Sequence, residues 1–328
     1  MARPCFQLGR TAHATGQQSR HGDCLLVLRP TKQRMPINAA LLPSLIELIR
    51  VASTVLPADV ACALAAGRGH EDAGSNAAYA LDVICDNIGL AKKRGLPLCQ
   101  DTGSLLFYVD FPRGFDADAF ARTCADAVRQ ATAAGYLRQN SVDSLTGKNS
   151  GDNLGPGSPD IHWHPWEKDF VAVRLMLKGG GCENVGAQYS LPDARLGGRD
   201  LSGAENAILD AVLQAQGQGC GPGILGVCLG GDRASGYAYS KRQFLRRLDD
   251  ANPDGMLADL ENRIIAKANR SGIGPMGFGG TTTLLGCKIG ALNRVPASYF
   301  VTVSYMCWAF RRQGVRLDGD GGIAAWLY

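Results

Sequence analysis

The stretch Leu98-Cys99-Gln100-Asp101-Thr102-Gly103 and the eight residues after it, Ser104–Phe111, mark the point where the sequence pattern changes from helices to strands. Before this stretch, apolar residues repeat at helical spacing in Asn38–Leu56 and in Ala77–Lys93, and Pro57 interrupts the first pattern. Ser104–Phe111 is rich in aliphatic and aromatic residues, which is typical of a β-strand. The sequence therefore predicts a helical N-terminal third, followed by a region of mixed helices and strands.

Downstream of this point, helices and strands follow one another without the strict alternation of a doubly wound fold. We expect a helix from Asp116, a favourable N-cap, to Ala134, and another that opens with a capping box of Ser202 and Glu205. Phe170–Leu177 alternates like a half-buried strand. Further elements are expected at residues 240–250 and 256–269 (helices) and at Ile224–Leu229, Leu284–Ile289 and Tyr299–Tyr305 (strands). The predicted fold class is α+β, or mixed α/β.

The positive charge is concentrated at the start of the sequence. The 328-residue chain has a net charge of +4, but residues 1–34 hold six basic residues against one acid, which leaves the other 294 residues near −1. We interpret residues 1–34 as a disordered extension or a misassigned start, with an arginine-rich targeting segment as the alternative. Residues 35–328 are expected to form one domain, helical at about 35–95 and α/β at about 96–328. The near-neutral domain argues against nucleic-acid binding, and no run of 18 apolar residues predicts a membrane span.

Forty-two glycines are far above the usual share, and they gather at residues 179–181, 217–231 and 272–280. Such clusters allow backbone N–H groups to approach an anion closely, although tight loop packing explains any single cluster equally well. Residues 221–226 match the G-x-G-x-x-G pattern of dinucleotide-binding proteins. However, a helix is expected before this pattern and a strand after it, the reverse of the order that a dinucleotide site requires.

The eleven cysteines are odd in number and irregularly spaced, and no secretory signal precedes them. This argues against a disulfide framework and predicts a reducing, cytoplasmic compartment. No C-x-x-C pair is present, so the sequence contains neither the cysteine spacing of a zinc knuckle nor that of a ferredoxin-type cluster motif. Cys99, Cys220 and Cys307 stand at the ends of expected helices or strands. They either converge on one metal cluster or are buried core residues like the others.

Short motifs follow one another between residues 41 and 312: Leu98-Cys99-Gln100-Asp101-Thr102-Gly103, Leu137-Arg138-Gln139-Asn140, Thr146-Gly147-Lys148-Asn149, Lys178-Gly179-Gly180-Gly181, Cys220-Gly221-Pro222, Gly272-Ile273-Gly274-Pro275-Met276-Gly277, and Cys307-Trp308-Ala309 with Arg311 and Arg312. In this order they resemble the α-subunit, or N-terminal domain, of class I iron–sulfur fumarate hydratases and of the related L-tartrate dehydratases. The resemblance implies a [4Fe–4S] cluster held by Cys99, Cys220 and Cys307, with the fourth iron left without a protein ligand. An open iron can act as a Lewis acid and template for a substrate carboxylate and hydroxyl.

The same resemblance implies a substrate site beside the cluster. Asp101 is the candidate for proton transfer, with an Asp that caps the turn before the strand as the alternative. Arg138 would clamp a carboxylate with its planar guanidinium, unless it is an ordinary surface arginine. Gln100 would hydrogen-bond the substrate, and the backbone N–H groups of Gly180 and Gly181 would bind its second carboxylate.

Four further positions bear on this interpretation. Lys148 and Lys178 are either anion contacts or ordinary surface lysines. Val295 stands twelve residues before Cys307, where the family usually has a His. The family takes its remaining catalytic groups from a C-terminal domain or a separate β-subunit, for which this chain has no room after Cys307. We therefore expect a β-subunit partner, dimerisation of the αβ unit, and no binding to nucleic acid or membrane.

Taken together, these features predict the α-subunit of an iron–sulfur hydro-lyase that adds or removes water on a C4 dicarboxylate, most simply between fumarate and malate. Residues 274–280 are closer to the fumarate hydratase form than to the L-tartrate dehydratase form. A non-catalytic, cluster-bearing sensor subunit is the rival from another class. Val295 and the missing domain favour this rival, whereas Asp101 and Arg138 argue against it, because a sensor needs no dicarboxylate clamp. A zinc or redox-thiol protein would need cysteine pairs that the sequence lacks.

Overall fold

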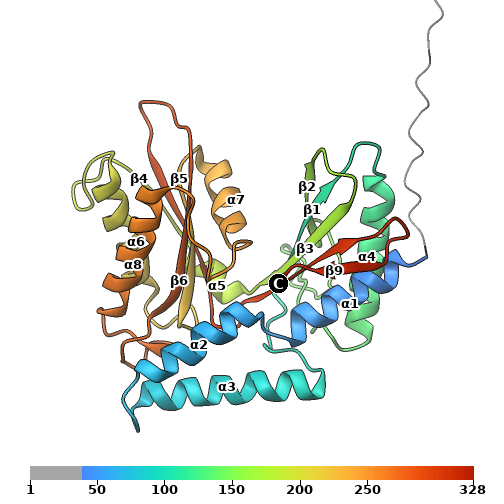
Figure 1. The fold of residues 1–328 in the computed structure, drawn as a ribbon, viewed down its shortest axis with the longest axis horizontal. Helices are drawn as coiled ribbons and strands as arrows, with labels where there is room; N and C mark the ends of the chain where they lie inside the picture. Colours follow the sequence, from blue (N-terminus) through green and yellow to red (C-terminus); the bar gives the residue numbers. More distant parts are fainter. Residues whose placement is uncertain (1–38) are drawn as a thin grey trace, which may run out of the picture. The chain divides into compact units, whose positions relative to one another are not determined.

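The computed structural model describes residues 39–328, and the predicted extension at residues 1–34 lies outside them. Within the described residues the fold is α+β, as the sequence predicts (Figure 1). Its helices are α1 (Leu41–Thr54), α2 (Ala58–His70), α3 (Asn76–Arg94), α4 (Ala117–Ala133), α5 (Gly180–Asn184), α6 (Leu201–Ala215), α7 (Arg233–Gln243), α8 (Gly255–Asn269) and the short 3-10 helix η1 (Pro275–Gly277). Its strands are β1 (Ser104–Phe111), β2 (Asp160–Pro165), β3 (Val171–Lys178), β4 (Ala187–Ser190), β5 (Gly223–Gly230), β6 (Leu284–Leu292), β7 (Phe300–Met306), β8 (Arg311–Leu317) and β9 (Ile323–Trp326).

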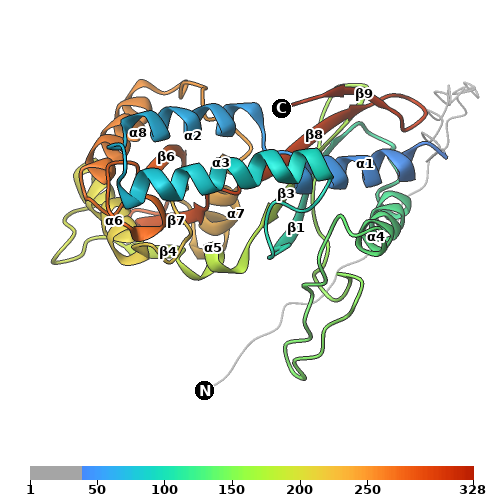
Figure 2. The same ribbon diagram turned by 90° about the horizontal axis from the view of Figure 1, so that it is seen from below.

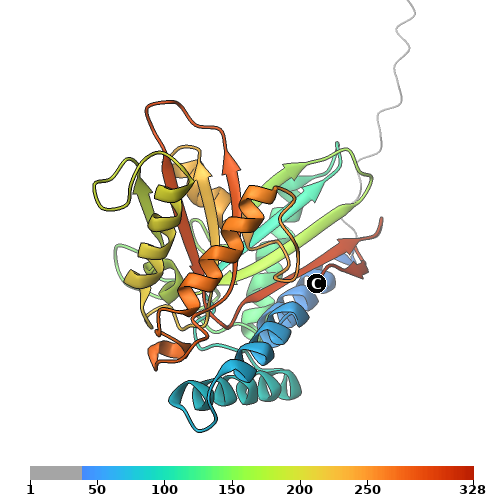
Figure 3. The same ribbon diagram turned by 60° about the vertical axis from the view of Figure 1, so that its left-hand side comes forward.

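The strands among residues 39–328 form two mixed sheets. The five-stranded sheet has the order β2-β1-β3-β8-β9, in which only β1 and β2 are parallel. The four-stranded sheet has the order β4-β7-β5-β6, in which only β5 and β6 are parallel. The chain passes from the first sheet to the second through α5, and it returns through residues 307–310, between β7 and β8 (Figure 3). The segments that follow β3 and β7 therefore link the two sheets.

Each sheet has its own hydrophobic core, and a third core joins the two. Helices α1 and α4 pack on one face of the five-stranded sheet, where Leu45, Phe107 and Phe120 are fully buried. Helices α6 and α8 cover one face of the four-stranded sheet and α7 lies on the other (Figure 1). The third core combines residues of both sheets, such as Met176 and Met306, with residues of α2 and α3, which lie side by side (Figure 2).

The apolar segment Leu41–His70 is long and apolar enough, by length and composition, to cross a membrane. The core helices of globular proteins share this length and composition, and 56% of the most apolar 18 residues of this segment are buried inside the protein. The segment is two helices, α1 and α2, separated at Leu56 and Pro57. Leu45 and Leu48 of α1 and Val60 of α2 are completely covered by the protein core.

Most predicted elements are confirmed, and three details are wrong. The N-cap of α6 is Asp200, whose carboxylate accepts a hydrogen bond from Gly203 N at 2.8 Å, so Ser202 and Glu205 form no capping box. The helix expected at 240–250 is α7 (Arg233–Gln243), which begins seven residues earlier because Asp232 and Ser235 form a capping box there. Strand β3 is buried along almost its whole length, because protein core covers both faces of its sheet.

A buried ion pair ties the C-terminal strands to the helical segment. Arg312 of β8 is fully buried, and its Nη2 lies 2.6 Å from Asp59 Oδ2 of α2. The same guanidinium donates to Phe244 O at 2.9 Å and stacks on the ring of Tyr328, with 4.1 Å to the ring centroid. Asp59 Oδ2 also accepts a hydrogen bond from Leu248 N at 2.8 Å. One pair of opposite charges therefore connects α2, β8 and the loop after α7.

Replacing Asp59 with alanine leaves the buried Arg312 guanidinium without its counter-charge. The free energy of unfolding, measured by urea denaturation, is expected to fall by about 3–5 kcal/mol. The matched control is Glu167→Ala, which removes a carboxylate paired with Arg113 at 3.0 Å on the exposed surface. That control is expected to lose no more than about 1 kcal/mol. Equal losses in the two variants would contradict the assigned role of Asp59.

Candidate active site

The loop between α3 and β1 carries Cys99 and Asp101 and is held at both ends. Leu98 N donates to Ser53 O at 2.9 Å, and Leu98 O accepts from Asn87 Nδ2 at 3.0 Å. At the other end, Gly103 has a φ of +75°, and a Cβ there would lie 2.4 Å from the carbonyl group of Lys178. Only glycine allows the start of β1 to approach the end of β3 this closely. The loop is thereby held against residues 178 and 179, where β3 ends just before α5 begins.

Asp101 is half-buried, and three hydrogen bonds orient its carboxylate. Oδ1 accepts from Gly103 N and from Asn140 Nδ2, both at 2.8 Å, and Oδ2 accepts from Gly180 N at 2.7 Å. Asp101 thus bonds its own turn, as the turn-capping alternative predicts, and it also reaches two other loops. The sequence predicts that the N–H group of Gly180 donates to the substrate, but in this structure it donates its hydrogen bond to Asp101. Asn140 is a neighbour that sequence reasoning did not assign.

Arg138 stands next to this carboxylate through its backbone. Thr102 Oγ1 donates to Arg138 O at 2.7 Å and accepts from Arg138 N at 2.9 Å, while Asn153 Nδ2 donates to Arg138 O at 2.9 Å. The Arg138 side chain is exposed and has no hydrogen bond or ion pair within residues 39–328. Its backbone is therefore fixed, and its guanidinium is available for an anion.

Cys220 lies on an exposed, strained turn between α6 and β5. Its φ is +54°, and the next peptide bond, Gly221–Pro222, is cis. Positive φ in a residue other than glycine is uncommon and is concentrated at functional sites. Met276 N donates to Gly221 O at 3.0 Å, so the glycine-rich loop around η1 supports this turn.

The three predicted cysteines come together from separate loops. Cys99 and Cys307 belong to the same core, the one that joins the two sheets. The Cys220 turn contacts the Cys307 segment, because Trp308 N donates to Cys220 O at 3.4 Å. Burial raises the pKa of the Cys220 thiol, and the nearby charges of Cys182, Cys99 and Asp101 raise it further. The structure thus brings together Cys99, Cys220 and Cys307, with Asp101 beside them.

A fourth thiol and two buried cations border this group. The Cys307 thiol and the Cys182 thiol are hydrogen-bonded partners, and this bond, together with the positive charges of Lys178 and Arg311, holds the pKa of Cys182 down at about 7 despite its burial. Arg311 is 1% exposed, and its Nε has no partner within the described residues. Sequence reasoning counted Cys182 as a structural thiol, and its place directly after the Gly179–Gly181 motif was the available signal.

Lys178 is completely buried, so the surface-lysine alternative is wrong for this residue. Burial lowers the pKa of its ammonium group against the raising effect of Glu183, whose Oε2 lies 3.1 Å from Lys178 Nζ. Glu183 also pairs with Lys241 of α7 at 2.6 Å. Lys148, in contrast, is exposed. Only one of the two lysines named from the sequence therefore borders the cysteines.

The remaining predicted positions differ in their surroundings. Gln100 is exposed beside Cys99 and Asp101, and Gly181 follows Gly180 in the first turn of α5. Val295 is 64% exposed in the loop between β6 and β7, at the opposite end of β7 from Cys307. A seven-residue strand spans roughly 23 Å at about 3.3 Å per residue. A side chain at position 295 therefore cannot reach Cys307 of its own chain.

The donor set suits an iron–sulfur cluster. Within residues 39–328, no three His, Cys, Asp or Glu side chains lie close enough together to hold one metal ion. A [4Fe–4S] cluster does not need that geometry, because each cysteine binds a different iron and thiolates are the usual ligands. The buried positive charges of Lys178 and Arg311 lower the pKa of Cys182, whereas the pKa of Cys307 is raised by its hydrogen bond with Cys182 and by burial. The residues present therefore fit the cluster that the sequence motifs imply.

Comparison with known proteins identifies the family of this chain. A family profile described as fumarate hydratase (Fumerase) matches residues 43–316. The chain belongs to this family.

A Geobacillus stearothermophilus protein assigned by name to class I fumarate hydratases is 52% identical over 290 residues, which are 87% of this chain and 56% of that protein. The chain thus spans little more than half the length of this relative. The L(+)-tartrate dehydratase subunit alpha named in Methanocaldococcus jannaschii is 30% identical, over 84% of this chain and 96% of that protein. Its Escherichia coli K12 counterpart is 29% identical, over 72% and 77% respectively.

One carboxylate secures the glycine-rich loop that supports the Cys220 turn. Glu71, at the end of α2, accepts hydrogen bonds from Thr281 N at 3.0 Å and from Thr282 N at 2.6 Å. Burial would raise the pKa of Glu71, but the bonds from Thr282 and Thr281 outweigh it, so the pKa is lowered overall. Gly280 leaves room for this contact, because a Cβ there would lie 2.4 Å from Glu71 Oε2.

The lowered pKa of Glu71 predicts a defined dependence of stability on pH. Its contribution is complete above the ordinary carboxyl pKa of 4.5 and is lost as pH falls through the lower folded-state pKa. The free energy of unfolding of the wild type is therefore expected to fall more steeply below about pH 5 than that of Glu71→Gln, which does not titrate. Glu167→Gln, on the exposed surface, is the matched control. Parallel pH profiles for the wild type and Glu71→Gln would contradict this role.

Proposed function

We propose that the chain is the α-type part of an iron–sulfur hydro-lyase that interconverts fumarate and malate. The observation that carries the proposal is the convergence of Cys99, Cys220 and Cys307 from three loops beside the oriented carboxylate of Asp101. The relative that is 52% identical is named for fumarate hydratase, whereas the relatives named for L-tartrate dehydratase are about 30% identical. This difference favours fumarate over tartrate.

In this proposal, Cys99, Cys220 and Cys307 each hold one iron of a [4Fe–4S] cluster. When bound, the cluster supplies a Lewis acid, through its open iron, for a substrate carboxylate and hydroxyl. The buried guanidinium of Arg311 and the ammonium group of Lys178 place positive charge near the Cys182 thiol. Glu183 pairs with Lys178 at 3.1 Å. The exposed position of Cys220 leaves this side of the site open for loading.

Asp101 is the group proposed to move the proton. An ionised carboxylate offers about four acceptor positions. Two bonds fill those of Oδ1 and one bond occupies Oδ2, so one acceptor position on Oδ2 stays free for a substrate C–H proton. In the hydration direction the same oxygen returns that proton to carbon. The three fixed donors keep the carboxylate from rotating away, which is how positioning contributes to the rate.

Arg138 is proposed to bind the substrate carboxylate. Its side chain is exposed and unpaired among the described residues, while its backbone is bonded to Thr102, one residue from Asp101. A guanidinium held in this way makes paired hydrogen bonds to a carboxylate. Gln100, at the same loop, adds a polar contact. We also propose that a β-type partner completes the active site, because the chain matches 96% of a relative named as a subunit alpha.

Cluster binding can be tested without measuring turnover. After anaerobic loading with ferrous iron and sulfide, Cys99 and Cys220 are expected to be protected from alkylation by iodoacetamide, as measured by mass spectrometry. The exposed thiols of Cys62 and Cys85 serve as internal controls and stay reactive. Cys307→Ser is expected to lower the bound iron per chain, whereas Cys124→Ser leaves it unchanged. Full reactivity of Cys99 and Cys220 in the loaded chain would refute the proposed ligand set.

The catalytic roles predict different kinetic losses in the complex of the chain with its β-type partner. Asp101→Asn is expected to lower kcat for fumarate hydration by about 10²–10⁴-fold, because the proton acceptor is lost. Arg138→Ala is expected to act mainly on KM, since its contact with the substrate exists before the reaction. Lys148→Ala, which removes an exposed charge nearby, is the control. A loaded complex that turns over neither fumarate nor L-tartrate would favour the sensor alternative.

A further inference from the structure

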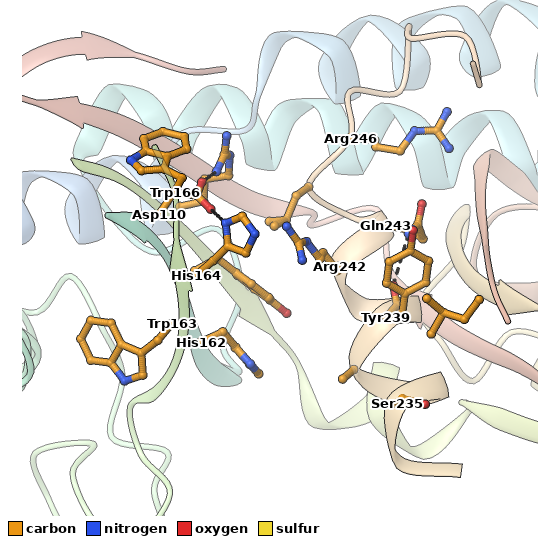
Figure 4. Close-up of a pocket in the computed structure, with 15 residues that line it drawn as sticks. Asp110, His162, Trp163, His164, Trp166, Ser235, Tyr239, Arg242, Gln243 and Arg246 are labelled. Carbon is orange, nitrogen blue, oxygen red and sulfur yellow. Dashed lines mark hydrogen bonds and ion pairs between the residues drawn. The ribbon is translucent and has the colours of Figure 1, made fainter. Parts of the chain in front are cut away.

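A cavity of about 870 Å³ lies between the five-stranded sheet and helix α7, and none of its lining residues belongs to the proposed active site. Strands β1, β2 and β3 form one wall, with Tyr108, His164 and Arg174 among its residues, and α7 forms the other, with Tyr239 and Arg242. Figure 4 shows the side chains of the two walls facing one another across the cavity. The cavity is large enough for an organic ligand.

The wall on α7 contributes an uncompensated positive charge. Arg242 has no ion pair or hydrogen bond with any residue from 39 to 328, whereas Arg246, which also lines the cavity, is neutralised by Asp250 at 2.8 Å and Glu261 at 2.7 Å. In Figure 4 the Arg242 side chain extends toward His164 on the opposite wall. A free guanidinium that is partly shielded from bulk water attracts an anion more strongly than a fully solvated one.

The opposite wall presents a histidine that is held for contact. His164 Nδ1 lies 2.8 Å from Asp110 Oδ1, and the other oxygen of Asp110 accepts from Arg174 Nη1. Both oxygens of the buried Asp110 carboxylate are therefore engaged, and its charge is balanced by Arg174. The His164 ring is half exposed, so Nε2 is the ring atom left for a ligand.

A buried hydroxyl without a partner points to a missing ligand. Tyr108 is 92% buried and lines the cavity, yet its hydroxyl has no hydrogen bond within the described residues. Its ring stacks on that of His162, with 4.6 Å between centroids and 11° between planes. Buried hydroxyl groups almost always have a partner, because leaving one unpaired costs stability. An acceptor oxygen of a bound molecule would complete this site.

We propose that this cavity binds a small organic anion through its carboxylate or phosphate groups, with Arg242 and His164 meeting the charge, the Tyr108 hydroxyl donating to an oxygen, and the aromatic side chains packing on the remainder. The two anion types share this chemistry, because guanidinium and imidazole groups bind both. The site is additional to the hydratase site and does not depend on the function proposed for it.

The proposal is tested by titrating the full chain, loaded with iron and sulfide, with three separate probes: inorganic phosphate, citrate and ATP. Isothermal titration calorimetry is expected to show saturable binding of at least one probe with Kd below about 1 mM. The probe that binds distinguishes phosphate from carboxylate recognition. Arg242→Ala is expected to weaken this binding at least about tenfold, equivalent to about 1.4 kcal/mol. The matched control, Arg122→Ala, removes an exposed arginine on α4 and is expected to leave the affinity unchanged.

Tyr108→Phe separates binding from folding. It removes only the unpartnered hydroxyl, so thermal stability is expected to stay the same or rise, while affinity for the probe falls several-fold. A drop in stability with unchanged affinity would overturn the role of Tyr108 as a ligand contact.

Three further results would overturn the proposal. One is the absence of saturable binding of all three probes by the wild type. Another is the loss of probe binding in Arg138→Ala but not in Arg242→Ala, which would place the anion at the proposed substrate site and leave the hydratase proposal intact. The third is a change in oligomeric state or in retention of a protein partner in Arg242→Ala, without a change in probe binding, which would make this cavity a protein interface.

Discussion

The rest of the structure depends on one constraint, which is the burial of three positively charged side chains. These side chains lie on the segments that link the two sheets. Lys178 ends β3, and Arg311 and Arg312 begin β8, so all three lie where the chain passes between the sheets. A buried charge requires compensation. Arg312 obtains it from Asp59 at 2.6 Å, and Lys178 obtains it from Glu183 at 3.1 Å. These pairs fix α2 and α5 relative to the strands.

Arg311 is compensated differently, and this links the constraint to chemistry. No carboxylate pairs with its guanidinium among the described residues, and its charge acts on the thiols of Cys182 and Cys307. The positive charge contributes to the lowered pKa of Cys182, whereas the hydrogen bond with Cys182 and burial raise the pKa of Cys307. The segment that carries a buried positive charge between the two sheets therefore also places this charge beside the thiols of Cys182 and Cys307. Asp101 is coupled to the other segment that links the sheets through its bond to Gly180 N at 2.7 Å.

Local sequence signals predicted most elements correctly, and they failed where two neighbouring signals competed. Asp116 caps α4 as expected, because its carboxylate accepts from Ala119 N at 3.0 Å. At α6, Ser202 and Glu205 have capping-box spacing, but Asp200, two residues earlier, makes the cap. The burial of β3 could not be predicted from its own alternation, since Arg174 interrupts an otherwise apolar run and the covering of both faces is a property of the assembled sheets.

The sequence by itself determined the family, and it pointed to Cys99, Cys220 and Cys307 as the proposed cluster ligands, because the motifs around these cysteines are local and keep a fixed order. Only the tertiary structure decided which other groups border them. Cys182, Lys178 and Arg311 are spread over more than 130 positions of the chain, and no local pattern relates them. The cavity between α7 and the five-stranded sheet is likewise invisible in the sequence, since its walls come from segments that are far apart along the chain. Local patterns encode helices, turns and motifs, whereas burial and charge neighbours arise from contacts between distant segments.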